Sequence, residues 1–353
     1  MALDDKINDA CHRIEELYYE TDGKCYVSFS GGKDSTVLLA LVKMCEELYT
    51  IPQGGIPAVF SNTGIELGVT VEFVKWVKEN WYPNVVVIHP ERSFDWVVKN
   101  NGKPIRSKLR SKLLDQYHTK PTEACKSLLI KGETMSTKRP AKKSRLADKD
   151  FHMLHQQFDI HASWECCNVM KKHPMAKYET DSGKKGCAIG LRMEEGGVRE
   201  LSAKNRVATN RKLCTYTKGK TLYKMPIIDW SNDEVEQFIK KNNVPLSKAY
   251  TEFGFERTGC MACPYSSNLN HDLNYLYYHE QNRYKAAMHW LKDVYIAENV
   301  ILPFDEAYEA ERVRMWKEKY EPMRQEMLRK YRPNSRLIKE YEQTDIFDFM
   351  GVE

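Results

Sequence analysis

The clearest chemical signal is one run of six residues, Ser30-Gly31-Gly32-Lys33-Asp34-Ser35. An apolar segment, residues 26–29, precedes the run, and a second apolar segment begins at Thr36. Adjacent glycines let backbone N–H groups approach an anion closely, and the N-terminus of a helix adds partial positive charge. Lys33 supplies a full charge and Ser35 a hydroxyl. We interpret the run as a phosphate-binding loop between a strand and a helix.

This loop differs from the Walker A loop of P-loop NTPases. Walker A requires a further glycine upstream of the glycine–lysine pair, and residues 25–30 contain none. An ordinary strand-to-helix turn is the alternative interpretation. The position of the run between two apolar segments favours phosphate binding.

Four cysteines form the second chemical signal. Cys166 and Cys167 are adjacent, whereas Cys260 and Cys263 have the Cys-x-x-Cys spacing that presents two thiolates to one metal ion. Four thiolates suit either zinc or an iron–sulfur cluster, and ligand softness does not decide between them. Cys187 and Cys214 are alternative ligands.

Charge is distributed unevenly along the chain. Residues 99–149 contain fifteen Lys and Arg against four Asp and Glu, a net charge of +11, whereas the whole chain carries +5. A basic block of this kind suits a polyanion such as nucleic acid. A solvated insertion without a partner is the alternative.

Composition narrows the class of protein. The chain has 353 residues, enough for two domains, with 42% apolar and 29% charged residues. Its first residues lack the order of a signal peptide, and no apolar run approaches the ~20 residues of a membrane span. We therefore expect a cytoplasmic protein with no membrane partner, in which the ten cysteines serve metal or redox chemistry and not disulfides.

The elements that must position these residues alternate between strand and helix. The pattern predicts a helix near residues 7–18, strands at 26–29, 56–60 and 85–88 (the last fully buried), and helices from 36 to 48 and over 69–79. Further strands are expected at 186–191 and 222–228, and a capping box at Ser231 and Glu234 predicts a helix over 235–241. This alternation indicates a doubly wound, mostly parallel α/β sheet, which binds ligands at the carboxyl ends of its strands.

The expected domain organisation has two parts. Residues 1–245 form the nucleotide-binding α/β domain, with the basic insertion at about 99–149. Residues 246–353 contain the Cys-x-x-Cys segment and a smaller helical C-terminal unit.

Several of these motifs resemble one family. The run Ser30–Ser35 resembles the PP-loop of ATP pyrophosphatases and of the sulfonucleotide (PAPS/APS) reductases, and implies an adenine nucleotide alpha hydrolase-like fold. Asn62-Thr63-Gly64 resembles the family's Asp-Thr-Gly loop, with Asn62 in place of the acid. The segment from Gly190 to Arg199 is similar to the family's Gly-x-Arg-x-x-Glu-Ser-x-x-Arg.

The resemblance assigns roles to these residues. It implies nucleotide binding by Ser30, Gly31, Gly32, Lys33, Asp34, Ser35, Asn62, Thr63, Gly64 and Gly190, and catalytic roles for Lys33, Asp34, Arg192 and Arg199. Cys-Cys followed by Cys-x-x-Cys resembles the cluster ligands of APS reductases and of DNA-phosphorothioation ATP pyrophosphatases. It implies a [4Fe-4S] cluster on Cys166, Cys167, Cys260 and Cys263, with Zn²⁺ as the alternative.

One departure selects among the functions that the resemblance implies. Sulfonucleotide reductases carry a catalytic cysteine near the C-terminus, and no cysteine follows Cys263 here. We therefore expect an ATP pyrophosphatase that uses ATP and Mg²⁺, coupled to sulfur transfer onto nucleic acid within a modification system that includes a protein partner. The alternatives are a PAPS or APS reductase that uses Cys187, Cys214 or a partner's thiol, and a nucleotide-binding regulatory module with a structural metal.

Overall fold

The chain folds into two compact units, each built from two separate segments. The computed structural model describes residues 2–195 and 214–341. Unit 1 comprises Met1–Ser93 and Val169–Cys260, and unit 2 comprises Phe94–Asn168 and Met261–Glu353. The boundary expected at residue 245 differs from this division, because the basic segment folds with the C-terminal helices.

Unit 1 contains a sheet of six described strands in the order β3-β2-β1-β4-β6-β5. The strands are β1 (Cys25–Ser28), β2 (Ala58–Ser61), β3 (Val85–Ile88), β4 (Gly186–Ile189), β5 (Thr215–Lys218) and β6 (Thr221–Lys224). Every pair is parallel except the β5–β6 hairpin. In the central register, Val27 lies opposite Ala58 on one side and Ala188 on the other. The mostly parallel α/β sheet expected from the sequence is confirmed.

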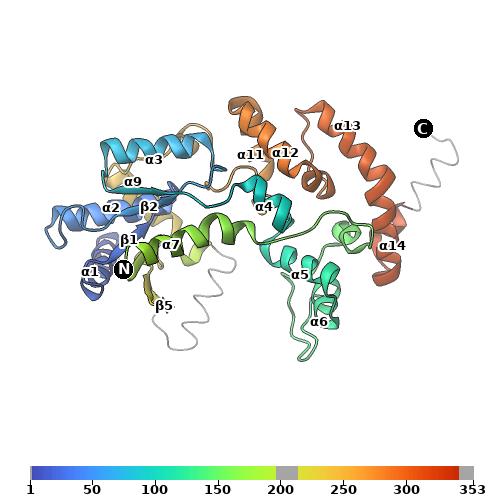
Figure 1. The fold of residues 1–353 in the computed structure, drawn as a ribbon, viewed down its shortest axis with the longest axis horizontal. Helices are drawn as coiled ribbons and strands as arrows, with labels where there is room; N and C mark the ends of the chain where they lie inside the picture. Colours follow the sequence, from blue (N-terminus) through green and yellow to red (C-terminus); the bar gives the residue numbers. More distant parts are fainter. Residues whose placement is uncertain (1, 196–213, 342–353) are drawn as a thin grey trace. The chain divides into compact units, whose positions relative to one another are not determined.

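Helices cover the sheet of unit 1 (Figure 1). They are α1 (Leu3–Glu20), α2 (Lys33–Glu47), α3 (Gly68–Asn80), α7 (His173–Asp181), α9 (Asn232–Lys241) and the short α10 (Lys248–Thr251), with single turns η3 (Asn168–Lys172) and η4 (Met193–Glu195). The capping box predicted at Ser231 and Glu234 opens α9.

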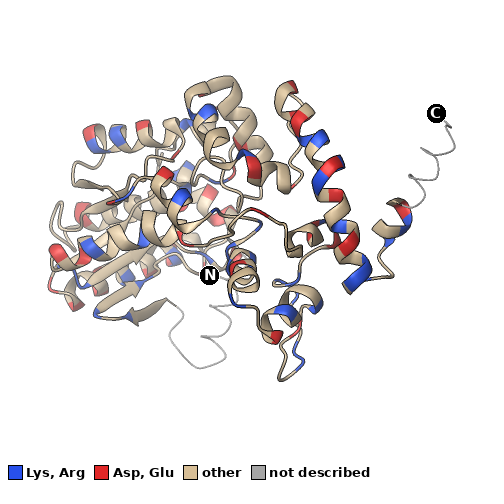
Figure 2. Cartoon of the chain, turned by 45° about the vertical axis from the view of Figure 1, so that its right-hand side comes forward, with Lys and Arg blue, Asp and Glu red and all other residues tan. Residues whose placement is uncertain are grey.

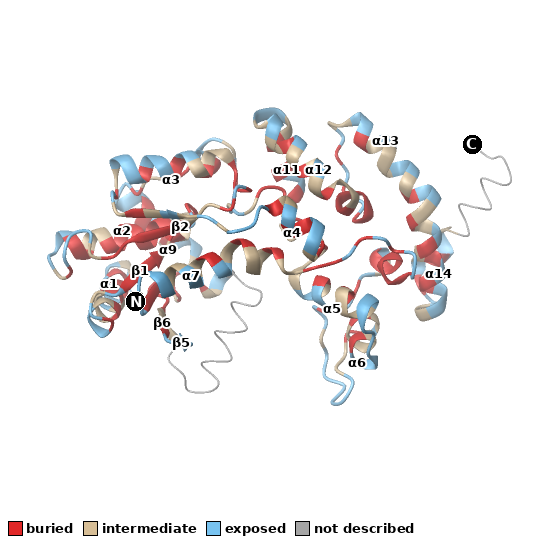
Figure 3. Ribbon diagram, viewed as in Figure 1, coloured by how far each residue is buried: buried red, intermediate tan, exposed pale blue. Residues whose placement is uncertain are grey.

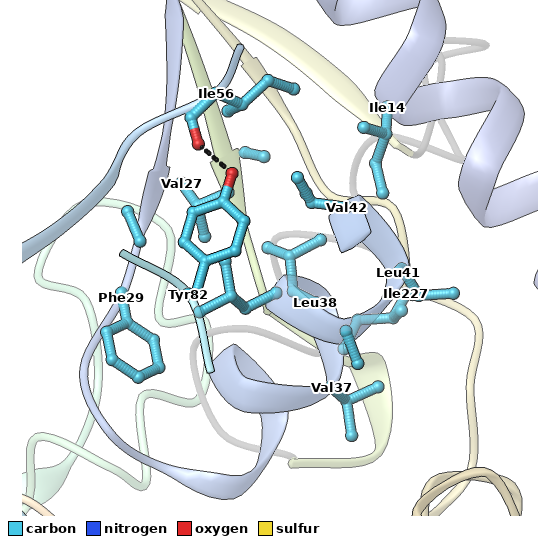
Figure 4. Close-up of a cluster of buried hydrophobic side chains, with 14 of the residues drawn as sticks. Ile14, Val27, Phe29, Val37, Leu38, Leu41, Val42, Ile56, Tyr82 and Ile227 are labelled. Carbon is cyan, nitrogen blue, oxygen red and sulfur yellow. Dashed lines mark hydrogen bonds between the residues drawn. The ribbon is translucent and has the colours of Figure 1, made fainter. Parts of the chain in front are cut away.

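The core of unit 1 lies between α2 and the central strands. Leu38 and Leu41 of α2 are fully buried and pack against Val27 and Ile56 (Figure 4). Tyr82 brings its hydroxyl into this core and donates a hydrogen bond of 2.6 Å to the Ile56 carbonyl oxygen. Burial of this apolar face fixes α2, and therefore the phosphate loop at its N-terminus, against β1.

The opposite face of the sheet is covered more thinly. A small cluster forms there around Tyr26, Val59 and Cys187, and the Tyr178 ring of α7 packs edge-on against Tyr26 with 5.6 Å between centroids. The prediction that residues 85–88 are fully buried is wrong, since Val87 is 38% exposed. β3 is an edge strand, with a neighbouring strand on one side only.

The described part of unit 2 is helical. Its elements are α4 (Phe94–Asn101), α5 (Lys108–Thr119), α6 (Glu123–Lys126), η1 (Ser127–Lys131), η2 (Asp148–Leu154), α11 (Leu269–His279), α12 (Gln281–Ala297), α13 (Glu306–Met315), η5 (Trp316–Tyr320) and α14 (Glu321–Tyr331). Ion pairs join the two segments of unit 2: Lys103 lies 2.7 Å from Asp293, and Arg106 contacts Glu298. Arg106 also contacts Asp150 within the first segment. These long-range pairs explain why the basic segment and the C-terminal helices form one unit, with buried residues running through both (Figure 3).

None of the helices described in either unit combines the length and apolar character needed to cross a membrane.

Candidate active site

The phosphate loop joins β1 to α2 in a tight, internally bonded turn. Gly31 has a φ of 70°, a conformation that favours glycine, and a Cβ there would lie 3.0 Å from side-chain atoms of Thr70 and Val74. The Ser35 hydroxyl accepts a bond of 3.2 Å from the Ser30 amide and donates one of 2.8 Å to the Gly32 carbonyl oxygen. The loop is therefore shaped before any anion arrives.

A cavity of about 810 Å³ opens at this loop, at the carboxyl ends of β1 and β4. Seven of the residues singled out from the sequence line it, namely Ser30, Gly32, Lys33, Asp34, Ser35, Gly190 and Arg192. Because β1 and β4 are neighbours in the sheet, residues about 160 positions apart in the chain reach the same cavity. Gly31 shapes the loop without lining the cavity.

Arg192 and Asp34 form the central ion pair of this cavity. The Arg192 side chain is buried, and its Nε donates to the Asp34 carboxylate at 2.8 Å while Nη2 donates to Asn232 Oδ1 at 2.9 Å. Gly190 permits this approach, because a Cβ at that position would stand 2.8 Å from the Asp34 carbonyl oxygen. The pair holds a guanidinium, which binds phosphate well, in a fixed orientation beside the loop.

Lys33 is held by a residue that the sequence did not reveal. Its ammonium lies 2.7 Å from the Glu236 carboxylate of α9. Its backbone amide donates at 3.1 Å to the Tyr250 hydroxyl, which in turn lies 3.1 Å from the Thr258 hydroxyl. Tyr250 therefore occupies one of the N-terminal amides of α2, a kind of group that can otherwise bind an anion.

Sequence reasoning also missed Asn232, Glu194, Glu256 and Arg257, which line the same cavity. Only Asn232 carries a local signal, since it follows the N-cap Ser231 directly. Glu194 belongs to η4, within the segment from Gly190 to Arg199. Glu256 and Arg257 are brought in by the packing of the segment after α10.

The loop Asn62–Gly64 follows β2 and is not among the described residues that line this cavity. Its side chains stabilise the loop itself: Asn62 Oδ1 accepts from the Gly64 amide at 3.1 Å, and the Thr63 hydroxyl donates to Glu66 at 2.7 Å. Glu66 also forms an isolated backbone bridge with Cys260. Nucleotide binding by Asn62, Thr63 and Gly64 stays a prediction. Arg199 lies outside the described residues.

None of the four cysteines of the predicted metal site forms a disulfide in the described part of the chain. Cys166 Sγ and Cys167 Sγ are 4.0 Å apart. Burial, together with the neighbouring Cys166, Cys167 and Cys263, raises the pKa of the Tyr265 phenol well above its usual range, which places these three thiols around one hydroxyl. Cys260 is the last residue of unit 1, where the chain passes into unit 2.

The donor set of four thiols fits zinc or an iron–sulfur cluster by its chemistry. Among the residues that the structure describes, however, no group of three or more His, Cys, Asp or Glu side chains is arranged to hold a metal ion. The metal site therefore stays a prediction.

The two alternative cysteines differ from each other. Cys187 is 1% exposed in the middle of β4, and burial raises the pKa of its thiol well above the usual value. A buried thiol of this kind is a poor nucleophile, because the thiolate is the reactive form. Cys214 is only half-buried.

Comparison with known proteins identifies the family of this chain. Residues 24–128 and 123–266 match the family model described as "Phosphoadenosine phosphosulfate reductase domain". The chain belongs to this family. The match includes the phosphate loop, the cavity and the Cys-x-x-Cys turn, so the family resemblance seen in the sequence is confirmed.

The curated relatives of this family member are distant. An uncharacterized protein of Methanocaldococcus jannaschii is 24% identical over 267 residues, covering 74% of this chain and 41% of the relative. An adenosine 5′-phosphosulfate reductase of Neisseria meningitidis is 30% identical over 105 residues, covering 30% of this chain and 38% of that enzyme. The chain thus matches less than half the length of these relatives.

Solved structures of similar fold include a phosphoadenylyl-sulfate (PAPS) reductase from Candida auris, with 12% identity and a TM-score of 0.39 over 70% of this chain and 87% of that chain. An FMN adenylyltransferase from Candida glabrata has 14% identity and a TM-score of 0.40 over 74% of this chain and 64% of that chain.

The Lys33–Glu236 pair leads to a first prediction. Glu236→Gln is expected to tighten ATP binding about two- to fivefold, because the change removes a carboxylate that competes with phosphate for Lys33 and repels the anion. Isothermal titration calorimetry measures the dissociation constant. Asp233→Asn, on the same helix but outside the cavity lining, is the control. Weaker ATP binding by Glu236→Gln would contradict the prediction and would make Glu236 a direct partner of the nucleotide or its metal.

Proposed function

We propose that this chain is an ATP pyrophosphatase that transfers the adenylyl group of ATP to an acceptor. The acceptor oxygen forms a bond to the α-phosphorus, the bond between that phosphorus and the α,β-bridging oxygen breaks, and pyrophosphate leaves. Catalysis of such a step consists mainly of positioning and of stabilising the charge on the leaving group.

The composition of the cavity lining carries this proposal. The described lining combines three cations, Lys33, Arg192 and Arg257, with four carboxylates, Asp34, Glu194, Glu236 and Glu256, and includes no cysteine. Carboxylates are the ligands that Mg²⁺ uses beside a bound triphosphate. Cleavage of a phosphosulfate by a reductase instead needs a thiol at the reacting sulfur.

Each side chain then has a role that follows from its position. The Lys33 ammonium and the Arg192 guanidinium bind the phosphates and stabilise the departing pyrophosphate. Ser30, Ser35 and the backbone of Gly31 and Gly32 supply hydrogen bonds. Asp34 orients Arg192 at 2.8 Å and would bind Mg²⁺, which neutralises phosphate charge when bound.

Nucleic acid is the acceptor that we propose, and the basic segment supports it. Lys99, Lys103, Arg106 and Lys126 are tied to carboxylates, so they contribute little free charge. The stretch 131–149, the basic arm, instead exposes Lys131, Lys138, Arg139, Lys142, Lys143, Arg145 and Lys149. Figure 2 colours the Lys and Arg positions of the chain blue. A surface of this charge suits a phosphate backbone.

The proposal also includes the cysteines and the location. Cys166, Cys167, Cys260 and Cys263 would hold a [4Fe-4S] cluster, with Zn²⁺ as the alternative, and the cluster would supply sulfur-transfer chemistry when bound. A protein partner from the same modification system would complete the reaction. Ten cysteines that form no disulfide suit the reducing cytoplasm.

Product analysis tests the proposal. Reduced, full-length chain is incubated with Mg²⁺ATP and an oligonucleotide acceptor, and separately with PAPS or APS and thioredoxin. Pyrophosphate release from ATP is expected. Sulfite release from PAPS or APS in its place would overturn the proposal in favour of a reductase. Tight nucleotide binding with neither product would favour a regulatory module.

The metal content gives a second prediction. Protein purified without oxygen is expected to contain about four iron atoms per chain and to absorb broadly near 400 nm, and Cys260→Ser is expected to lose both. Cys11→Ala, which changes a buried thiol of α1, is the control and should retain the iron. Colourless protein with one zinc ion, or iron unaffected by Cys260→Ser, would contradict the cluster assignment.

A further inference from the structure

A second cavity lies in unit 1, on the thinly covered face of the sheet. Its volume is about 890 Å³, within the range of ligand-binding pockets. One wall is formed by α7 together with η3 before it and residues 183–185 after it, and the rest is formed by β1, β4, β6, β5 and the β5–β6 turn. We call it the sheet-face groove. The mechanism proposed above assigns a role to none of the residues that line this groove.

The groove is lined mainly by lysines and tyrosines. Six lysines contribute to its lining, Lys171, Lys172, Lys184, Lys185, Lys218 and Lys220, against one carboxylate, Glu179. In the part of the chain that the structure describes, no Asp or Glu forms an ion pair with Lys185, Lys218 or Lys220. The last two are exposed on the β5–β6 turn. Such a lining attracts an anion with several separated charges.

The single carboxylate is already satisfied within the protein. Glu179 accepts hydrogen bonds from the hydroxyls of Tyr26 at 2.7 Å, Tyr223 at 2.9 Å and Thr221 at 3.1 Å. It therefore fixes the half-buried Tyr223 ring in place, which lowers the entropy cost of stacking a ligand on that ring.

The tyrosines provide flat surfaces along the groove. The rings of Tyr216 and Tyr223 lie stacked, with centroids 4.8 Å apart and an angle of 6° between planes, and both residues are half-buried. Aromatic platforms interspersed with lysines are how proteins bind single-stranded nucleic acid, since bases stack on the rings while the lysines contact phosphates. A duplex offers no free base faces for this arrangement.

The groove also meets the candidate active site. Ser28 and Ile189, the last residues of β1 and β4, line both the groove and the phosphate-loop cavity. A single-stranded nucleic acid that lies along the sheet face would therefore bring one nucleotide to the carboxyl ends of β1 and β4. The α-phosphate of ATP is expected at the same place.

We infer that the sheet-face groove binds a single-stranded segment of nucleic acid. Its role as the acceptor rests on the proposed function, whereas the binding itself does not. The lysines on the β5–β6 turn hold the backbone, and Tyr216 and Tyr223 stack bases.

Fluorescence anisotropy tests this inference with the full-length chain and a labelled 12-nucleotide single-stranded DNA of mixed sequence. Tyr216→Ala is expected to raise the dissociation constant fivefold or more, the loss that one base–aromatic stack produces, whereas Tyr216→Phe keeps the ring and should bind like wild type. The double variant Lys218→Ala/Lys220→Ala is expected to weaken binding and to make the salt slope shallower by about 1.4.

Matched controls locate the site. Lys75→Ala/Lys78→Ala removes two lysines of α3 that do not line the groove, and should leave affinity within twofold of wild type. Lys142→Ala/Lys143→Ala tests the basic arm separately. Thermal unfolding of each variant identifies any that fail to fold. If Tyr216→Ala fails to fold, the variant Lys218→Ala/Lys220→Ala, which changes an exposed turn, still tests the inference.

Three results would overturn the inference. The first is an oligonucleotide affinity that is unchanged in both groove variants, and the second is equal binding of the duplex form with no effect of Tyr216→Ala. The third is binding of AMP at the groove while the groove variants leave oligonucleotide binding unchanged, because the ligand would then be a mononucleotide. Failure of the proposed function is seen separately, as absent pyrophosphate release while Tyr216→Ala still weakens oligonucleotide binding.

Discussion

Arg192→Ala is expected to lower the rate of pyrophosphate release from ATP by about 100-fold or more, the usual loss when a preorganised electrostatic group is removed from a reacting centre. Arg192 is buried, and its orientation is fixed by Asp34 and Asn232 at 2.8 and 2.9 Å. No lysine can reproduce the planar fork of a guanidinium. Arg192→Lys should therefore recover only part of the rate.

The control for this experiment is Arg13→Ala. Arg13 also forms a partly buried ion pair in unit 1, with Asp229 at 2.8 Å, but it does not line the cavity. Arg13→Ala should lower the stability of the fold while each folded molecule still releases pyrophosphate at the wild-type rate. Asp34→Asn and the double variant complete a cycle, in which the two losses are expected to be far from additive because the residues act as one unit. Full activity in Arg192→Ala would refute the assigned role.

Arg106→Ala is expected to destabilise unit 2 by about 3–5 kcal/mol, the cost of removing one partner from a buried ion pair. The Arg106 side chain lies between the carboxylates of Asp150 and Glu298, which are 1% and 5% exposed. Its Nη2 also donates to the Glu298 carbonyl oxygen at 3.0 Å. Without the guanidinium, two buried carboxylates would lack their counter-charge.

The pH dependence of this loss has a definite sign. Burial raises the pKa of Glu298 to about 7, above its unfolded value, so the stability contributed by its protonated form is present at low pH and lost as pH rises toward 7. At pH 5 the carboxyl is protonated and needs Arg106 less. The destabilisation by Arg106→Ala should therefore be larger at pH 8 than at pH 5.

Urea denaturation followed by tryptophan fluorescence measures both effects. Arg110→Ala is the control, since Arg110 belongs to the same basic segment but its side chain donates to the Arg145 carbonyl oxygen at the surface. Arg110→Ala should lower the free energy of unfolding by less than about 1 kcal/mol. If Arg106→Ala lowers the free energy of unfolding as little as the control does, the structural role of the buried ion pair is contradicted.

The sequence by itself determined the parts of this protein that depend on neighbouring residues. The phosphate loop, the strand before it and the helix after it lie where residues 26–48 predicted them, because apolar periodicity, the paired glycines and the helix N-terminus act over a few positions. The capping box at Ser231 also placed α9 correctly. The family match extends the same local motifs.

Only the tertiary structure decided which distant residues meet. Glu236 and Tyr250 reach Lys33 across more than 200 positions, and nothing in their local sequence distinguishes them from surface residues. The antiparallel strand β5 has the sequence Thr-Tyr-Thr-Lys, which contains no apolar run, so neither it nor the sheet-face groove was foreseen. The division into units followed from buried pairs such as Arg106 with Glu298. Such contacts depend on how whole elements pack, which residue spacing along the chain does not encode.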